Sequence, residues 1–388
     1  MAANVQALTA EQFQPSFWRR FVLPPDPSQP SRVWHTSPAI DMAAYHFSWI
    51  WLLIPFLLTG WDDLRFYVYA VMMGANLAHR HYGLPYAYLD GSVFRQYQRQ
   101  LTWFPLLCIA LFAATPLFVI HEDRGSLLSR ILIGIVTFSL LWNIWHTYMQ
   151  KFGILRLYLA KEPAAATKTP GWVDKYFLLC WIPLYFTYAV PKNKEQLLDY
   201  GTDLYDVLSA VVAFMEKYET LLLIPSILIA AGGVGLWLYH EWRTQRLRNR
   251  ARLSAAIGTT LISTALFWAN PMNAVIAFAF SHAVEYMVFV WAFQRRFYNR
   301  PRQAPPVMQR LLSHSLSWYF LFTAAFVAIG FFQVLWGYKF FVDADPVSFL
   351  GLSGARWYFY YAVFESLVHF HMDGFLWKMR RPEVRSFV

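Results

Sequence analysis

The sequence predicts an all-α, polytopic integral membrane protein with about ten transmembrane helices in one bundle. Of its 388 residues, 57% are hydrophobic and only 14% are charged, whereas soluble domains carry about 25% charged residues. The apolar residues are grouped in runs of about 20, the length that crosses a bilayer. The chain also has 18 tryptophans and 23 tyrosines, whose amphipathic rings favour the membrane interface.

The chain divides into one transmembrane domain and two flanking segments. Residues 1–37 are polar and lack an early apolar run, so we expect a cytoplasmic segment that is not a cleavable signal peptide. Residues 38–380 are expected to form the transmembrane domain, and residues 381–388 a short cytoplasmic tail. The predicted spans are 40–60, 63–82, 102–120, 127–149, 173–190, 219–240, 254–269, 272–293, 315–336 and 355–377.

Two connections between the spans are informative. The sequence Asn-Pro-Met-Asn at 270–273 is a tight turn signal, and it alone separates the seventh and eighth runs. The segment 191–217 mixes apolar and acidic residues, which favours an amphipathic surface segment. We expect that segment to be extracytoplasmic.

The basic residues give the orientation. With ten spans, 25 of the 33 lysines and arginines fall on the side that holds both termini. The positive-inside rule places that side in the cytoplasm, so we expect both termini there, in a bacterial inner membrane. The net charge of +10 comes from short loops between apolar runs. This pattern favours attraction to anionic lipid and argues against a nucleic-acid partner.

The predicted topology places ten of the eleven histidines in the cytoplasmic half, with His121 on the opposite face. Interfacial histidines can extend toward water, which is the expected role of His35, His240 and His314, while His46 stays open between the two roles. The remaining histidines recur with carboxylates at helical spacing. The residues at these spacings are His282 with Glu285, and Glu365 with His369 and Asp373.

We interpret this set as a site for one or two transition-metal ions, because imidazole and carboxylate ligands suit iron, with zinc or another transition metal as the alternative. In each His-x-His pair the side chains point about 200° apart on a continuous helix, so both can be ligands only if the helix ends nearby. Gly83, Pro85 and Gly374 could end those helices. The expected metal ligands are His79, His81, His146, His282, Glu285, His369 and His371, and the expected catalytic carboxylates are Glu285, Glu365 and Asp373.

This arrangement resembles the membrane-bound histidine-motif di-iron enzymes, such as fatty-acid desaturases and alkane hydroxylases, which also gather histidines at the cytoplasmic ends of helices. The chain lacks their boxes of adjacent histidines. The resemblance implies iron-dependent hydroxylation, desaturation or oxygenation of a membrane lipid or another hydrophobic substrate. It also implies an electron-donor protein as a partner.

Two alternatives stay open. The Trp145-His146 pair and the number of spans resemble the membrane-bound O-acyltransferases, which implies a metal-free acyltransferase with His146 or His282 as general base. A haem protein or a transporter is the third possibility. Metal content distinguishes the iron-enzyme hypothesis from acyl transfer, and a visible absorption spectrum identifies haem.

Overall fold

The computed structural model describes residues 17–23, 33–58, 60–119, 127–162, 169–192, 194, 205–244, 249–269, 271–298, 323–325, 327–332 and 354–378. These residues form helices and connecting turns without any β-strand, which confirms the all-α class. The longest helices are α4 (Asp62–His81), α6 (Gln98–Val119), α7 (Leu127–Ala160), α12 (Tyr205–Arg243), α15 (Pro271–Tyr298) and α18 (Gly354–Leu376).

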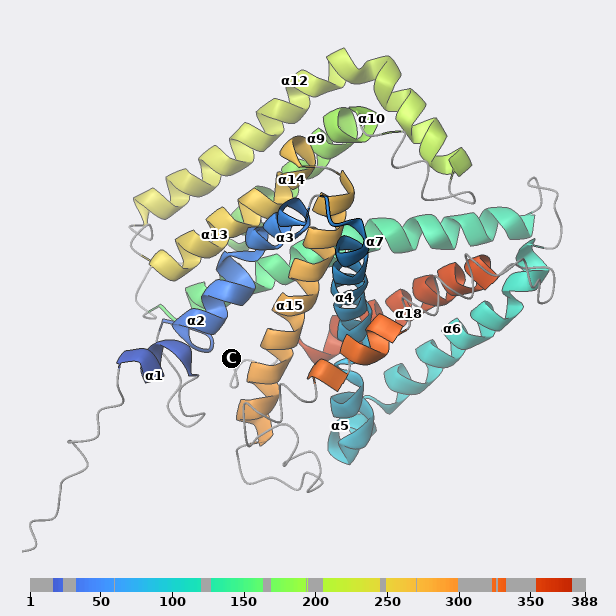
Figure 1. Cartoon of the computed structure of the whole chain (residues 1–388), viewed down its shortest axis with the longest axis horizontal. Helices are drawn as coiled ribbons and strands as arrows, with labels where there is room; N and C mark the ends of the chain where they lie inside the picture. Colours follow the sequence, from blue (N-terminus) through green and yellow to red (C-terminus); the bar gives the residue numbers. More distant parts are fainter. Residues whose placement is uncertain are drawn as a thin grey trace, which may run out of the picture.

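Shorter helices complete the described part of the chain (Figure 1). They are α1 (Phe17–Val22), α2 (Pro38–Asp41), the π-helix η2 (Met42–His46), the 3-10 helix η3 (Ser48–Leu52), α3 (Leu53–Leu57), η4 (Pro85–Leu89), α5 (Gly91–Gln96), α8 (Gly171–Leu179), α9 (Trp181–Leu184), η5 (Tyr185–Ala189), α10 (Val190–Lys192), α13 (Arg250–Ser263) and α14 (Ala265–Trp268).

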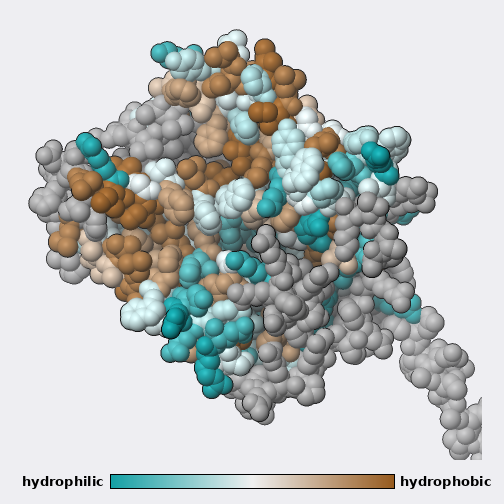
Figure 2. Space-filling model, turned by 180° about the vertical axis from the view of Figure 1, so that it is seen from behind, coloured by the Kyte–Doolittle hydropathy of each residue, from teal (hydrophilic) through white to brown (hydrophobic). Residues whose placement is uncertain are grey.

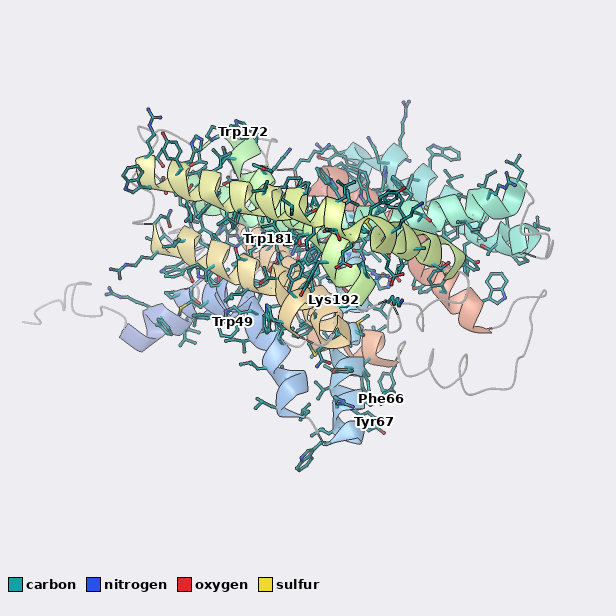
Figure 3. The ribbon with its side chains drawn as sticks, turned by 90° about the horizontal axis from the view of Figure 1, so that it is seen from above. Trp49, Phe66, Tyr67, Trp172, Trp181 and Lys192 are labelled. Carbon is teal, nitrogen blue, oxygen red and sulfur yellow. The ribbon has the colours of Figure 1, made fainter. Side chains whose placement is uncertain are left out.

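Four segments of the described chain are helical, long and apolar enough to cross a membrane: Gly91–Leu117, Arg130–Ala160, Val212–Arg243 and Asn273–Tyr298. Figure 2 shows wide apolar areas on one face of the molecule, with hydrophilic residues gathered near its lower edge. Figure 3 shows exposed aromatic side chains on opposite sides of the molecule, among them Trp172 on one side and Tyr67 on the other. These features indicate a membrane protein.

The number of such helices is smaller than the ten spans predicted from the sequence. The run 40–60 is divided among α2, η2, η3 and α3, and Gly60 ends it with a φ of 88° that favours glycine. The run 173–190 is divided in the same way among α8, α9 and η5, and 254–269 between α13 and α14. The apolar composition of a run does not reveal these breaks, because it carries no information on where the backbone leaves the helical conformation.

Two further predicted spans are not among the four candidate helices, and a third is largely outside the described residues. The runs 63–82 and 355–377 are single helices, α4 and α18, but each carries several ionisable side chains. The run 315–336 lies largely outside the described residues. The predicted surface segment 191–217 is in part the beginning of α12, which continues without a break from Tyr205 to Arg243.

Helix α15 lies at the centre of the fold. It packs along α4, and α4 in turn contacts α18, which lies beside α6 and α7. Small residues allow these helices to approach closely, since Ala75 and Ala78 of α4 and Ala283 of α15 are almost fully buried. This packing brings one end of α4 against the middle of α15, where the candidate site lies.

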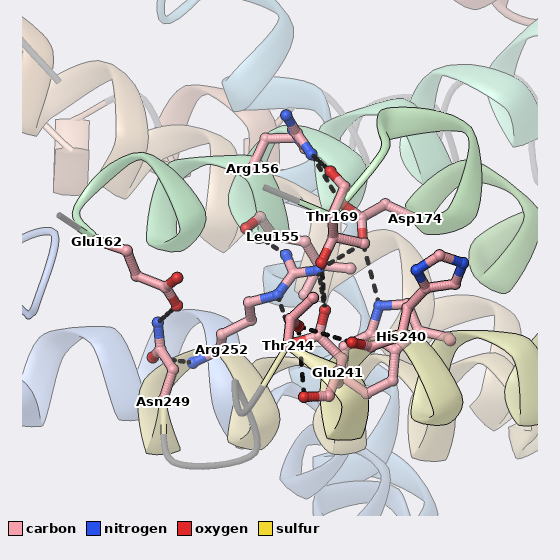
Figure 4. A network of polar contacts seen from close by, with 11 residues as sticks. Leu155, Arg156, Glu162, Thr169, Asp174, His240, Glu241, Thr244, Asn249 and Arg252 are labelled. Atoms are coloured by element: carbon pink, nitrogen blue, oxygen red, sulfur yellow. Dashed lines mark hydrogen bonds and ion pairs between the residues drawn. The ribbon is translucent and has the colours of Figure 1, made fainter. Parts of the chain in front are cut away.

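A buried ionic network joins α7, α8, α12 and α13 (Figure 4). The guanidinium of Arg252 donates to Asp174 Oδ1 at 2.6 Å and to both carboxylate oxygens of Glu241, at 2.9 and 3.0 Å. It also donates to the carbonyl of Leu155 at 2.8 Å, and Trp237 Nε1 donates to Asp174 Oδ1 at 3.0 Å. Each buried charge has an opposite charge in contact, so the loss of any one partner would leave an uncompensated buried charge among these helices.

Candidate metal centre

Four histidines from four different helices face one another. They are His79 of α4, His146 of α7, His282 of α15 and His369 of α18. The ring centroids of neighbours are 4.8 Å apart for His79–His282, 5.1 Å for His282–His146, 5.1 Å for His146–His369 and 4.7 Å for His369–His79. The four rings therefore close a circle, which we call the histidine cage, and neighbouring rings are nearly perpendicular.

Most nitrogens of the cage lack a hydrogen-bond partner in the part of the chain that the structure describes. They are both ring nitrogens of His79, both of His282, and Nε2 of His146 and His369. The rings of His79, His282 and His369 are only 2 to 3% exposed. Buried polar groups are nearly always paired in folded proteins, so this concentration of unpaired nitrogens indicates a site for a ligand.

Asp373 adds an oxygen to the cage. Its Oδ2 lies 3.4 Å from His146 Nε2 and 3.5 Å from His369 Nε2. Asp373 follows His369 by four residues, so the two side chains share one face of α18. The described residues contain two groups whose ligand atoms lie within 4.8 Å of one another: His79, His282 and His369, and His146, His369 and Asp373.

The dimensions of the cage suit a single transition-metal ion. Metal–imidazole bonds are about 2.0–2.1 Å long, so two rings bound at a tetrahedral angle have centroids roughly 5 Å apart. The four neighbour distances of 4.7 to 5.1 Å match this value. His369 belongs to both groups, so the two groups adjoin and share one ligand.

Glu285, expected to be both a ligand and a catalytic carboxylate, points to α7 instead. Lys151 Nζ lies 2.5 Å from its Oε1, and both side chains are 1% exposed. Ser281 donates to the same oxygen at 3.0 Å, while Gln150 donates to Oε2 at 3.2 Å. Gln150 also donates to the carbonyl of His282 at 2.9 Å, so Gln150 and Lys151 of α7 hold the part of α15 that carries this cage residue.

His81 and Glu365 form a separate contact outside the cage. His81 Nε2 lies 2.7 Å from Glu365 Oε1, and Arg80 Nη1 lies 3.3 Å from Glu365 Oε2. Helix α4 continues to His81 before Tyr82 caps it. Gly83 and Pro85 therefore come too late to bend His81 back toward His79.

His371 also lies away from the cage. Its ring stacks on Phe104 of α6, with centroids 4.1 Å apart and an interplanar angle of 19°. Helix α18 runs through Gly374 to Leu376, so the two histidines of this pair point in different directions. The structure thus brings one histidine of each His-x-His pair, His79 and His369, into the cage.

Among the other histidines, His35 is wholly buried, which shows that the expectation of a water-facing side chain was wrong. Its Nδ1 lies 3.1 Å from the hydroxyl of Tyr45. Burial, followed by the positive charges of Arg296 and Lys161, lowers the pKa of His35 well below its ordinary value. His46 is also buried and contacts the hydroxyl of Tyr158 at 2.9 Å. His121 and His314 lie outside the described residues.

Two residues that contact the site residues, Lys151 and Tyr286, were not predicted from the sequence. Lys151 follows Gln150 in α7 and lies just beyond the end of the predicted span 127–149, so it was not considered as a neighbour of the site. Tyr286 follows His282 by four residues, so it shares the face that carries the cage residue. Its ring centroid lies 5.4 Å from that of His79 and 5.2 Å from that of His369.

No known protein-family model matches the chain, and no curated protein or solved structure shows a significant match to it. The function of the chain is therefore inferred from the geometry and chemistry of the cage.

Proposed function

We propose that the chain is a membrane metalloenzyme that binds a transition metal in the histidine cage together with Asp373. The observation that carries the proposal is a set of six buried ring nitrogens that have no hydrogen bond among the described residues. Only two of them, those of His146 and His369, face a carboxylate, that of Asp373. An unpaired buried polar group costs about 1–3 kcal/mol. A bound cation satisfies several of these nitrogens at once, which explains why four helices place them together.

Iron is the metal that we favour. Imidazole and carboxylate donors suit iron, zinc and manganese, and the described cysteines, Cys108 and Cys180, do not belong to either ligand group. Iron supplies redox chemistry toward O₂ when it is bound, whereas zinc does not. Because the two ligand groups share His369, we propose that they hold one iron.

The substrate is proposed to be lipid-soluble, because the more open side of the cage is apolar. The side chains of His146 and Asp373 are 13% and 11% exposed, whereas that of His369 is only 3% exposed. On α7, Trp142 lies about one turn before His146 and Trp145 directly precedes it, and they are 40% and 39% exposed. A lipid or hydrocarbon chain could approach His146 along these rings, while the buried part of the cage excludes water.

The proposed reaction is an oxidation of that substrate, by hydroxylation, desaturation or oxygenation. In a hydroxylation, one oxygen atom of O₂ enters a C–H bond and the other leaves as water, which consumes two electrons and two protons. An electron-donor protein on the cytoplasmic side would supply the electrons. We place both termini in the cytoplasm and the protein in a bacterial inner membrane, with further spans beyond the four helices described above.

Metal analysis of the detergent-purified full chain tests the proposal. We expect about one iron per chain after loading, and a variant with His282→Ala should lose it. The matched control is His240→Ala, because His240 lies at the end of α12, away from the cage. With membrane lipid extract, a reductant and ¹⁸O₂, the loaded protein should yield a product that carries ¹⁸O or lacks two hydrogens. A wild-type protein that binds no transition metal would refute the metal centre, one that binds a metal other than iron would refute the choice of iron, and an iron-loaded protein without either product would refute the oxidation.

Acyl transfer is the second candidate, favoured by one contact. Asp373 Oδ2 lies 3.4 Å from His146 Nε2, which resembles the way a carboxylate orients a general-base histidine. His282 has no such partner among the described residues. Acyl exchange by metal-free protein, abolished by His146→Ala, would support this candidate over oxidation.

A further inference from the structure

Tyr286 connects the histidine cage to a second layer of side chains. It lies on α15 one turn after His282, and it is 4% exposed. Its hydroxyl donates to Asp373 Oδ1 at 2.9 Å. The same hydroxyl oxygen accepts a hydrogen bond from Trp377 Nε1 at 3.0 Å.

These two bonds fix the direction of the tyrosine proton. The indole nitrogen of Trp377 can only donate, so it occupies a lone pair of the hydroxyl oxygen of Tyr286. The hydroxyl proton of Tyr286 is then directed to Asp373 Oδ1. A hypothetical Cβ at Gly83 would lie 3.2 Å from this hydroxyl, so glycine at that position leaves room for it.

The two oxygens of Asp373 therefore have different surroundings. Oδ1 accepts from Tyr286, while Oδ2 faces His146 Nε2 and His369 Nε2 at 3.4 and 3.5 Å. An oxygen that already accepts a hydrogen bond is a poorer metal ligand than its free neighbour. Carboxylates that bind metals are commonly held by such outer partners.

We propose that Tyr286, oriented by Trp377, is a positioning residue that makes Asp373 bind the metal through Oδ2 alone. This inference rests on the proposed metal centre. It adds that Tyr286 limits the number of coordination positions that Asp373 occupies on the metal. A carboxylate that binds through one oxygen occupies one position instead of two. The position that is kept open is available to O₂ or to the substrate.

Cobalt(II) is the probe for the test, because its visible absorption weakens as the coordination number rises above four. The experiment titrates detergent-purified full-length protein with Co²⁺ and records affinity and spectrum. Tyr286→Phe keeps the ring contacts with His79 and His369 and removes only the hydroxyl. We expect about 10- to 100-fold weaker binding, the usual effect of losing an outer partner, and a weaker visible band because Asp373 can then bind through both oxygens.

Tyr298→Phe is the matched control. Tyr298 lies on the same helix, is equally buried, and donates to a buried aspartate, Asp90 Oδ2, at 3.0 Å. Its removal tests the loss of a buried tyrosine hydroxyl without touching the cage. We expect the affinity and spectrum of this variant to match those of the wild type.

The outcomes separate this inference from the proposal beneath it. If wild-type protein binds Co²⁺ and Tyr286→Phe binds it with the same affinity and spectrum, the positioning role is wrong and the metal centre stands. If wild-type protein does not bind Co²⁺, both are wrong. If Tyr286→Phe does not fold, Trp377→Phe provides the test. This variant keeps the Tyr286 hydroxyl but removes the indole hydrogen bond that orients it. An altered Co²⁺ spectrum in that variant supports the role, and an unaltered one overturns it.

Discussion

At the scale of single residues, the identity of the cage histidines depends on which way each side chain leaves its helix. The sequence indicates which histidines lie near one depth, because their positions along apolar runs are visible. It does not distinguish His79 from His81, since that requires the rotation of α4 relative to α15. The structure makes the distinction: His79 faces His282, and His81 contacts Glu365.

This distinction gives a direct prediction for the pair on α4. His79→Ala should lower metal affinity by more than about 100-fold, because a ligand is worth more than an outer partner, whose loss costs about 10- to 100-fold. His81→Ala should leave metal content close to that of wild type. Metal content after equilibration with limiting iron measures both. Equal losses in the two variants would mean that His81 also binds the metal.

Another residue-scale prediction concerns His35, which lies outside the candidate spans. Its pKa is lowered in the folded protein by burial and by Arg296 and Lys161. Below the ordinary histidine pKa of about 6.5, the unfolded chain therefore binds a proton at this position that the folded chain does not, and the stability supplied by neutral His35 is lost as pH falls. This residue should remove about 1.4 kcal/mol of unfolding free energy per pH unit below that point.

The measurement for His35 is the unfolding free energy in detergent at several pH values between about 7.5 and 5.5. His35→Gln should show a shallower decline than wild type over this range, because glutamine does not titrate. Parallel declines in the two proteins would show that His35 does not contribute to the pH dependence.

At the scale of helices, the sequence predicts the long apolar elements better than the connections between them. The four candidate spans match runs recognised by composition, since a helix that faces lipid needs an unbroken apolar surface. The breaks in 40–60 and 173–190 were not predicted, because they depend on how η2 and α9 pack against α13 and α12. The two backbones approach so closely at Gly258 of α13 that a Cβ there would clash with the carbonyl of His46.

The Arg252 network provides the element-scale prediction. Arg252→Met leaves Asp174 and Glu241 buried without their shared cation, and breaking such a network by removing one partner costs about 3–5 kcal/mol. Arg250→Ala is the matched control, because Arg250 is exposed at the start of the same helix and should change stability by less than about 0.5 kcal/mol. Thermal unfolding in detergent measures both. Similar midpoints for the two variants would contradict the stabilising role.

At the scale of the whole molecule, the orientation of the chain in the membrane is a prediction that is based on the sequence alone. The basic loops place Lys192 outside the cytoplasm and Arg243 inside it. Single cysteines at these exposed positions, in a chain without Cys108 and Cys180, should react with a membrane-impermeant thiol reagent from opposite sides of the membrane. Labelling from the same side would refute the proposed topology and the cytoplasmic position of the metal centre.

The ionic network of Figure 4 also has a consequence for the nascent chain during synthesis. Asp174 and Glu241 leave the ribosome before Arg252 does, so two acidic side chains are present before their common cation. The contact among α7, α8 and α12 is therefore incomplete until α13 has been synthesised. A nascent chain that ends before Arg252 should remain open to proteases and insertion chaperones at this point, and a chain that extends beyond α13 should become resistant.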